Sequence, residues 1–113
     1  MRKSDKKLDN QIIKALKTVC HIALEDIEGF QWLTHTVKFD NFPQSLKVIC
    51  VFDNNKSLAS YAKSAKVPDL VALIAAELEN IGIELNNINN QVEIDSEENC
   101  RLYHAGNWNK RLA

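Results

Sequence analysis

The most informative stretch of this sequence is Leu46-Lys47-Val48-Ile49-Cys50-Val51-Phe52, which is apolar at every position except Lys47. It is shorter than an ordinary helix and rich in β-branched residues, so it predicts a β-strand. A strand that is apolar on both faces is typical of a central position in a sheet covered on both sides. We therefore expect the core of the chain to form around this strand.

A second predicted strand precedes the first and covers residues 30–39, where aromatic and β-branched residues are frequent. Between the two strands lies Asp40-Asn41-Phe42-Pro43, a sequence typical of a turn. Such a short connection predicts an antiparallel hairpin. Simple alternation along residues 30–39 places Leu33, Val37 and Phe39 on one face, with Phe30 and Trp32 on the other.

Helical periodicity accounts for most of the remaining chain. Apolar residues recur at steps of three and four from Leu8 to Ile27, with Ser4 or Asp5 as the N-cap and Gly29 as the stop. Further helices are expected over residues 56–65, 68–81 and 96–104, the last after a short strand at residues 92–94, whereas residues 83–90 are expected to form a loop. The order α-β-β-α-α-β-α predicts an α+β fold: a small, mainly antiparallel sheet of about three strands packed against helices.

Length and composition point to one globular domain spanning residues 1–113. The chain is 45% hydrophobic and 26% charged, close to the averages for folded domains, so it has enough apolar surface for a core. No stretch is long and apolar enough to predict a membrane span, so no membrane partner is expected. Cys20, Cys50 and Cys100 are odd in number and far apart, which favours reduced thiols and a cytoplasmic location.

The net charge of −1 is unevenly distributed along the chain. Residues 1–17 hold six Lys or Arg against two Asp, residues 101–113 are also basic, and the region between them is acidic. An acidic body argues against a broad nucleic-acid-binding face, but basic ends that met in space could form a local one. The residues for this alternative are Lys3, Lys6, Lys7, Lys110 and Arg111.

A metal-dependent active site is a further alternative, with His35, Asp95, Cys100 and His104 as candidate ligands. Cys100 and His104 are four residues apart and would share one helix face, a spacing that can chelate an ion. The competing explanation is structural, because acidic residues such as Asp95 stabilise helix N-termini and cysteines often fill small spaces in a core. No phosphate-binding loop or hydrolase motif occurs, so no catalytic residue and no cofactor are assigned.

Several segments together resemble a family of short, uncharacterised bacterial cytosolic proteins: residues 1–10, Gly29-Phe30-Gln31-Trp32-Leu33-Thr34-His35, residues 45–52 and Asp95-Ser96-Glu97-Glu98. Some members of that family are labelled Fis-type transcriptional regulators, which implies a C-terminal helix-turn-helix that reads the major groove. The present sequence departs from that pattern, since its last segment lacks two consecutive amphipathic helices. The resemblance therefore implies a bacterial cytosolic origin and transfers no site residues.

The leading functional hypothesis is a non-enzymatic module that binds another protein or a second copy of itself. Aromatic and arginine residues are enriched at the energetic centres of protein interfaces. The candidate interaction residues are Trp32, Tyr103, Trp108 and Arg111. A homodimer formed through the sheet or the first helix is plausible under this hypothesis.

Overall fold

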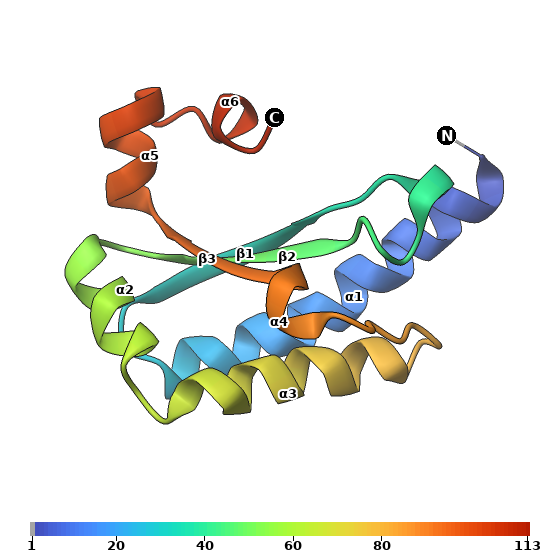
Figure 1. Cartoon of the computed structure of the whole chain (residues 1–113), viewed down its shortest axis with the longest axis horizontal. Helices are drawn as coiled ribbons and strands as arrows, with labels where there is room; N and C mark the ends of the chain where they lie inside the picture. Colours follow the sequence, from blue (N-terminus) through green and yellow to red (C-terminus); the bar gives the residue numbers. More distant parts are fainter. Residues whose placement is uncertain (1) are drawn as a thin grey trace.

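The computed structural model describes residues 2–113, which form helices around one small sheet (Figure 1). The elements in chain order are α1 (Lys3–Asp26), β1 (Phe30–Thr36), η1 (Phe39–Asn41), β2 (Lys47–Phe52), α2 (Asn55–Ala62), α3 (Lys66–Glu79), α4 (Ile88–Gln91), β3 (Val92–Ser96), α5 (Glu97–His104) and α6 (Trp108–Arg111). The α+β class is confirmed. Short helical segments η1, α4 and α6 add to the predicted order, and α4 occupies part of the predicted loop.

The sheet has the strand order β1-β2-β3. The hairpin is present, since β1 pairs antiparallel with β2, whereas β3 pairs parallel with β2. The sheet is thus mixed, with one pair of each kind. The parallel pair follows from connectivity, because α2, α3 and α4 form a long crossover that returns the chain to the starting end of β2.

The central strand β2 is covered on both faces, as its apolar sequence predicts. Its residues Val48, Cys50 and Phe52 belong to the main core, and Ile49 and Val51 on the other face are also buried. Figure 1 shows α1 and α3 on one side of the sheet and the C-terminal α5 and α6 on the opposite side. The chain therefore has a large core beneath the sheet and a smaller apolar layer above it.

A β-bulge near the start of β1 makes one prediction wrong. Phe30 pairs with Phe52 and Trp32 pairs with the next residue, Val51, so Gln31 is an extra residue on β1. Because of this insertion, Phe30 lies in the main core and packs edge to face on Phe52, whereas Trp32 faces the α6 side. Phe30 and Trp32 consequently lie on opposite faces of the sheet.

Helix α1 buries the apolar stripe seen in its sequence, including Ile12, Leu16 and Val19, against the sheet and α3. Its N-cap is Arg2, which makes no side-chain capping bond, so the predicted cap at Ser4 or Asp5 is wrong. The helix ends before Gly29, whose φ of 84° allows the turn into β1. Among the described residues, no helix is long and apolar enough to cross a membrane.

Candidate functional site

The outer edge of β1, the side that does not face β2, has backbone groups without a strand partner. Among residues 2–113, the backbone of Trp32 to Thr36 makes no hydrogen bond outside its pairing with β2. These residues are all partly exposed, so the edge is not covered by another element. A row of unpaired N–H and C=O groups on such a strand is a template for pairing with another extended segment.

The β1 edge also lacks the features that usually prevent such pairing. Proteins protect edge strands with Lys, Asp, Glu or Pro, and β1 contains none of these residue types. The opposite edge of the sheet differs, because β3 carries Glu93, which pairs with Lys47 at 3.3 Å, and Asp95, which is held by Arg111. The β3 edge therefore carries charged side chains that oppose strand pairing, whereas the β1 edge carries none.

A recess of about 300 Å³ flanks the β1 edge on the α1 side of the sheet. It is lined by Leu33 of β1 and by Ile13 and Cys20 of α1. His35 closes one end, where its Nε2 lies 2.7 Å from Oδ1 of Asp9. The recess is mainly apolar and can accept an apolar side chain of a strand added at the edge. The complete lining is Ile13, Leu16, Lys17, Cys20, Leu33, Thr34 and His35.

A second recess, of about 410 Å³, flanks the same edge on the α6 side. Trp32 and Trp108 pack edge to face in its lining, with ring centroids 4.9 Å apart. Thr34 and His35 line both recesses, so the two recesses adjoin across the strand. Side chains of an added strand alternate between the two faces of the sheet, and each face here offers a hollow. The complete lining is Trp32, Thr34, His35, Thr36, Trp108, Asn109, Leu112 and Ala113.

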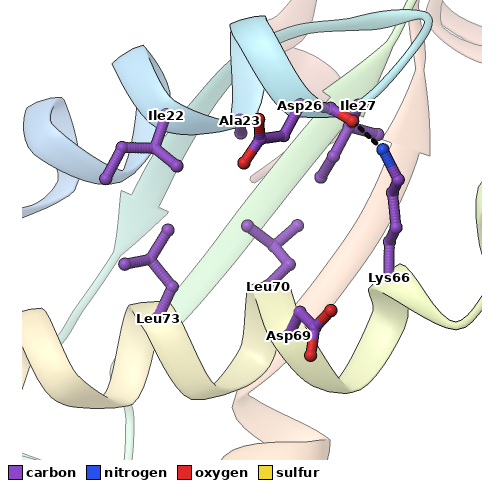
Figure 2. A pocket seen from close by; sticks show the side chains of 8 residues that line it. All are labelled: Ile22, Ala23, Asp26, Ile27, Lys66, Asp69, Leu70 and Leu73. Carbon is purple, nitrogen blue, oxygen red and sulfur yellow. Dashed lines mark hydrogen bonds between the residues drawn. The ribbon is translucent and has the colours of Figure 1, made fainter.

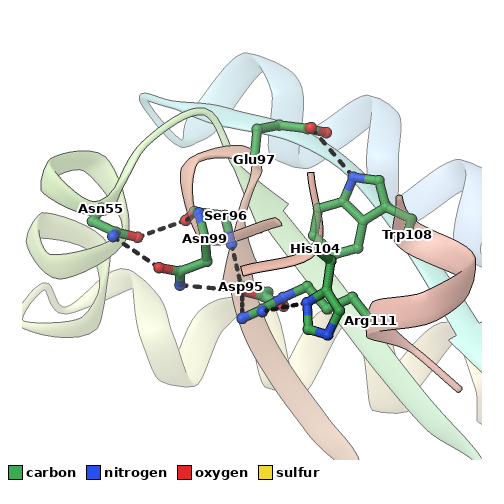
Figure 3. Close-up of polar contacts among 8 residues, drawn as sticks. All are labelled: Asn55, Asp95, Ser96, Glu97, Asn99, His104, Trp108 and Arg111. Carbon is green, nitrogen blue, oxygen red and sulfur yellow. Dashed lines mark hydrogen bonds and ion pairs between the residues drawn. The ribbon is translucent and has the colours of Figure 1, made fainter. Parts of the chain in front are cut away.

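A polar network fixes α6 in this position (Figure 3). Arg111 donates to both carboxylate oxygens of Asp95, from Nε at 2.6 Å and from Nη2 at 2.9 Å, and its Nη1 lies 3.3 Å from Nδ1 of His104. The carboxylate of Glu97 accepts from the indole N–H groups of Trp32 at 2.5 Å and Trp108 at 3.2 Å. The network therefore anchors the wall of the second recess to β1, β3 and α5.

The electrostatics of Asp95 agree with this anchoring role. Partial burial opposes ionisation, but the hydrogen bonds from Arg111, the Ser96 amide and Asn99 outweigh it and lower the pKa of the Asp95 carboxyl below its usual value. Ser96, rather than Asp95, caps α5, because its hydroxyl oxygen accepts from the Asn99 amide at 3.0 Å. Asp95 thus serves as the partner of Arg111.

The four candidate metal ligands do not gather at one point. His35 contacts Asp9, Asp95 and His104 both contact Arg111, and Cys100 is buried. Within residues 2–113, no group of three or more His, Cys, Asp or Glu side chains is placed to hold a metal ion. Asp95 and His104 do lie close together, but the group between them is the guanidinium of Arg111, whose positive charge occupies the place of a metal ion.

The predicted interaction residues do gather. Trp32 packs on Trp108, and Arg111 binds Asp95 and so holds α6 in place. The Cζ atom of Arg111 lies over the exposed ring of Tyr103, 5.8 Å from the ring centroid. The basic residues Lys3, Lys6 and Lys7 lie in the first turns of α1, whereas Lys110 belongs to α6. Figure 1 shows the start of α1 apart from α6. The Arg111 charge is already paired with Asp95.

A smaller cavity of about 150 Å³ lies between the end of α1 and the start of α3 (Figure 2). Ile22, Leu70 and Leu73 give it apolar walls, and the Lys66 ammonium donates to the Asp26 carbonyl at its mouth. The charged residues in its lining are Asp26, Lys66 and Asp69.

Comparison with known proteins identifies no relative: no family model, no curated protein and no solved structure matches the chain. The assignment of the site therefore depends on its geometry. Sequence reasoning found Trp32 and Trp108 but missed Ile13, Thr34 and Leu112, whose part in the site depends on which edge of the sheet is open. The available signal was a strand free of charge and proline.

Proposed function

We propose that this protein is a non-enzymatic interaction module that pairs an extended protein segment with the β1 edge. The observation that carries the proposal is the open edge of β1, with an adjoining recess on each face of the sheet. In this mode of recognition, backbone hydrogen bonds supply affinity and pockets for alternate side chains supply specificity.

The surroundings of the edge support this proposal. Trp32 and Trp108 present rigid aromatic surface beside the strand, and such residues are over-represented at the energetic centres of interfaces. The polar network around Asp95 and Glu97 holds these rings before any partner arrives. Preorganisation of this kind reduces the entropy lost on binding.

We further propose a bacterial, cytoplasmic setting for this module. Cys20, Cys50 and Cys100 are all free thiols, as expected in a reducing compartment. The resemblance noted for residues 1–10 and 29–35 is the support for a bacterial origin.

The experiment is selection of binders from a phage library of random linear peptides on immobilised full-length protein. Enriched peptides should slow amide hydrogen exchange in β1. The variant Thr34→Lys places a charge at the centre of the edge and should abolish binding. The matched control Thr18→Lys makes the same change on the exposed surface of α1 and should leave binding intact. Failure to enrich any peptide that is lost in Thr34→Lys would overturn the proposal.

A further inference from the structure

The open edge has a specific geometry that restricts its partner. The stretch from Trp32 to Thr36 is free of bulges, and Thr34 is its midpoint and lines both recesses. Resting on the function proposed above, we infer that the segment captured by β1 is β1 of a second copy of this chain. A two-fold axis at Thr34 pairs the two β1 strands antiparallel, so that the two sheets become one continuous sheet.

The same axis controls how the two α1 helices meet. Helix α1 lies against the core side of β1 and runs back along it, so a two-fold axis sets the helices of the two copies antiparallel. On the β1-edge side of α1, Ile13, Lys17 and Cys20 line the first recess, and Leu24 follows four residues later on the same face.

Apolar side chains of this α1 stripe are exposed in the single chain. Ile13 is 47% exposed and Leu24 is 51% exposed, which is unusual for large apolar residues of a helix that otherwise buries its apolar face. In the antiparallel arrangement, the α1 stripe of each copy, from Ile13 to Leu24, faces the same stripe of the other. This contact removes four apolar side chains from water, Ile13 and Leu24 of each copy.

Charge along α1 favours a second copy over another partner. Lys14 and Lys17 lie near the stripe in the first part of the helix, and Glu25 lies in its last turn, followed by Glu28 in the turn after the helix. Antiparallel helices place the basic part of one copy against the acidic part of the other. This complementarity is built into the chain itself, so it suits a second copy.

The edge strand is self-complementary in the same way. With Thr34 on the axis, Leu33 lies opposite His35 of the second copy, and Trp32 lies opposite Thr36. No pair in this register joins two like charges, because β1 has no Lys, Arg, Asp or Glu. Trp32 of each copy would stand beside the recess formed by Trp108 and Thr36 of the other.

The test is the mass of the full-length protein in solution, measured by light scattering over a dilution series. We expect twice the mass of the chain at high concentration. Ile13→Glu and Leu24→Lys should each raise the dimer dissociation constant about tenfold or more, since a charge then faces an apolar side chain. The double variant should recover part of the loss, because it places charges of opposite sign in the stripe that the two copies share.

The control is Leu102→Glu, which introduces the same charge at an apolar residue of α5 that is 63% exposed and lines neither recess. It should leave the dimer unchanged. A monomer at every concentration, a dimer unaffected by Ile13→Glu and Thr34→Lys, or a dimer lost equally in Leu102→Glu would overturn the inference.

These outcomes are distinguishable from failure of the proposed function. Leu24→Lys leaves the β1 edge and the linings of both recesses unchanged, so it can serve as a second bait for the peptide library. Peptides that bind a purely monomeric protein at β1 would refute self-pairing and retain the module. A dimer that Thr34→Lys does not weaken, together with a library that yields no β1-binding peptide, would refute both self-pairing and the proposed function.

Discussion

Trp32 and Trp108 come from the first strand and the last helix, yet their rings pack edge to face and their indole N–H groups donate to the two oxygens of one carboxylate, that of Glu97. This carboxylate links the C-terminal helix to β1, in addition to the ion pair between Arg111 and Asp95. The contact stabilises the fold and shapes the proposed binding edge at the same time.

Replacing this carboxylate should therefore loosen α6. Glu97→Ala leaves two partly buried indole donors without a protein acceptor, which should lower the free energy of unfolding by about 1–2 kcal/mol. Urea unfolding followed by tryptophan fluorescence measures this directly, since the chain has only these two tryptophans. Glu79→Ala, an exposed change at the end of α3, is the control. Equal unfolding midpoints for the two variants would contradict the bridging role of Glu97.

The ion pair between Asp95 and Arg111 should make stability depend on acid pH. The pKa of Asp95 is lowered in the folded chain, because the hydrogen bonds from Arg111, the Ser96 amide and Asn99 outweigh the opposing effect of burial. A depressed carboxyl pKa contributes stability above the unfolded value of 3.8 and loses it as pH falls through the folded value.

At pH 7, Asp95→Asn should consequently lower the free energy of unfolding by about 1–3 kcal/mol, because it leaves the charge of Arg111 without its partner. The difference should shrink as pH falls below 3.8. Thermal unfolding of both proteins from pH 7 down to pH 2 provides the measurement. A difference that stays constant across this range would show that the charge of Asp95 does not stabilise the fold.

Local patterns were sufficient to predict much of this fold. The stripe of α1, the hairpin and the buried strand β2 each depend on periodicity within one short segment, so their identities are visible in the sequence. The parallel pairing of β3 depends on a long crossover, and the sheet was expected to be mainly antiparallel. The two helices between the strands were a usable signal for the parallel pair.

The site was harder to predict than the fold. A single extra residue, Gln31, places Phe30 and Trp32 on opposite faces of the sheet, and no residue type in the strand indicates the bulge. Asp95 has the position of a helix cap, but its role is decided by Arg111, which arrives from a later helix. Contacts between distant segments of this kind depend on the tertiary arrangement, which local pattern does not encode.

Gly29 offers a test of the turn that leads into β1. A Cβ at this position would overlap the side chain of Ser57, and the φ of 84° is itself costly for an L-residue. Gly29→Ala should destabilise the chain by about 1–3 kcal/mol from the backbone strain alone. Gly82→Ala has the same φ with open space around the new methyl group, so it should cost less. Calorimetric melting of both variants decides the point, and equal losses would show that the contact with Ser57 is unimportant.

The three thiols should differ sharply in reactivity. Cys50 and Cys100 have no exposed surface, and burial, reinforced by the nearby Cys20, raises the pKa of the Cys50 thiol to about 12. Cys20 is partly exposed in the recess beside Leu33. Because the reactive species is the thiolate of an accessible cysteine, native protein should titrate one fast thiol with a disulfide reagent, and denatured protein should titrate all three.

The variant Cys20→Ser should remove the fast reaction and leave two thiols that react only on unfolding. The same residue reports on self-pairing, since Cys20 lies within the α1 stripe that a second copy would cover. Its reaction rate should fall as protein concentration rises through the dimer dissociation constant, and Leu24→Lys should restore the rate of the dilute protein. A rate independent of concentration in a protein that light scattering shows to be dimeric would place the interface elsewhere.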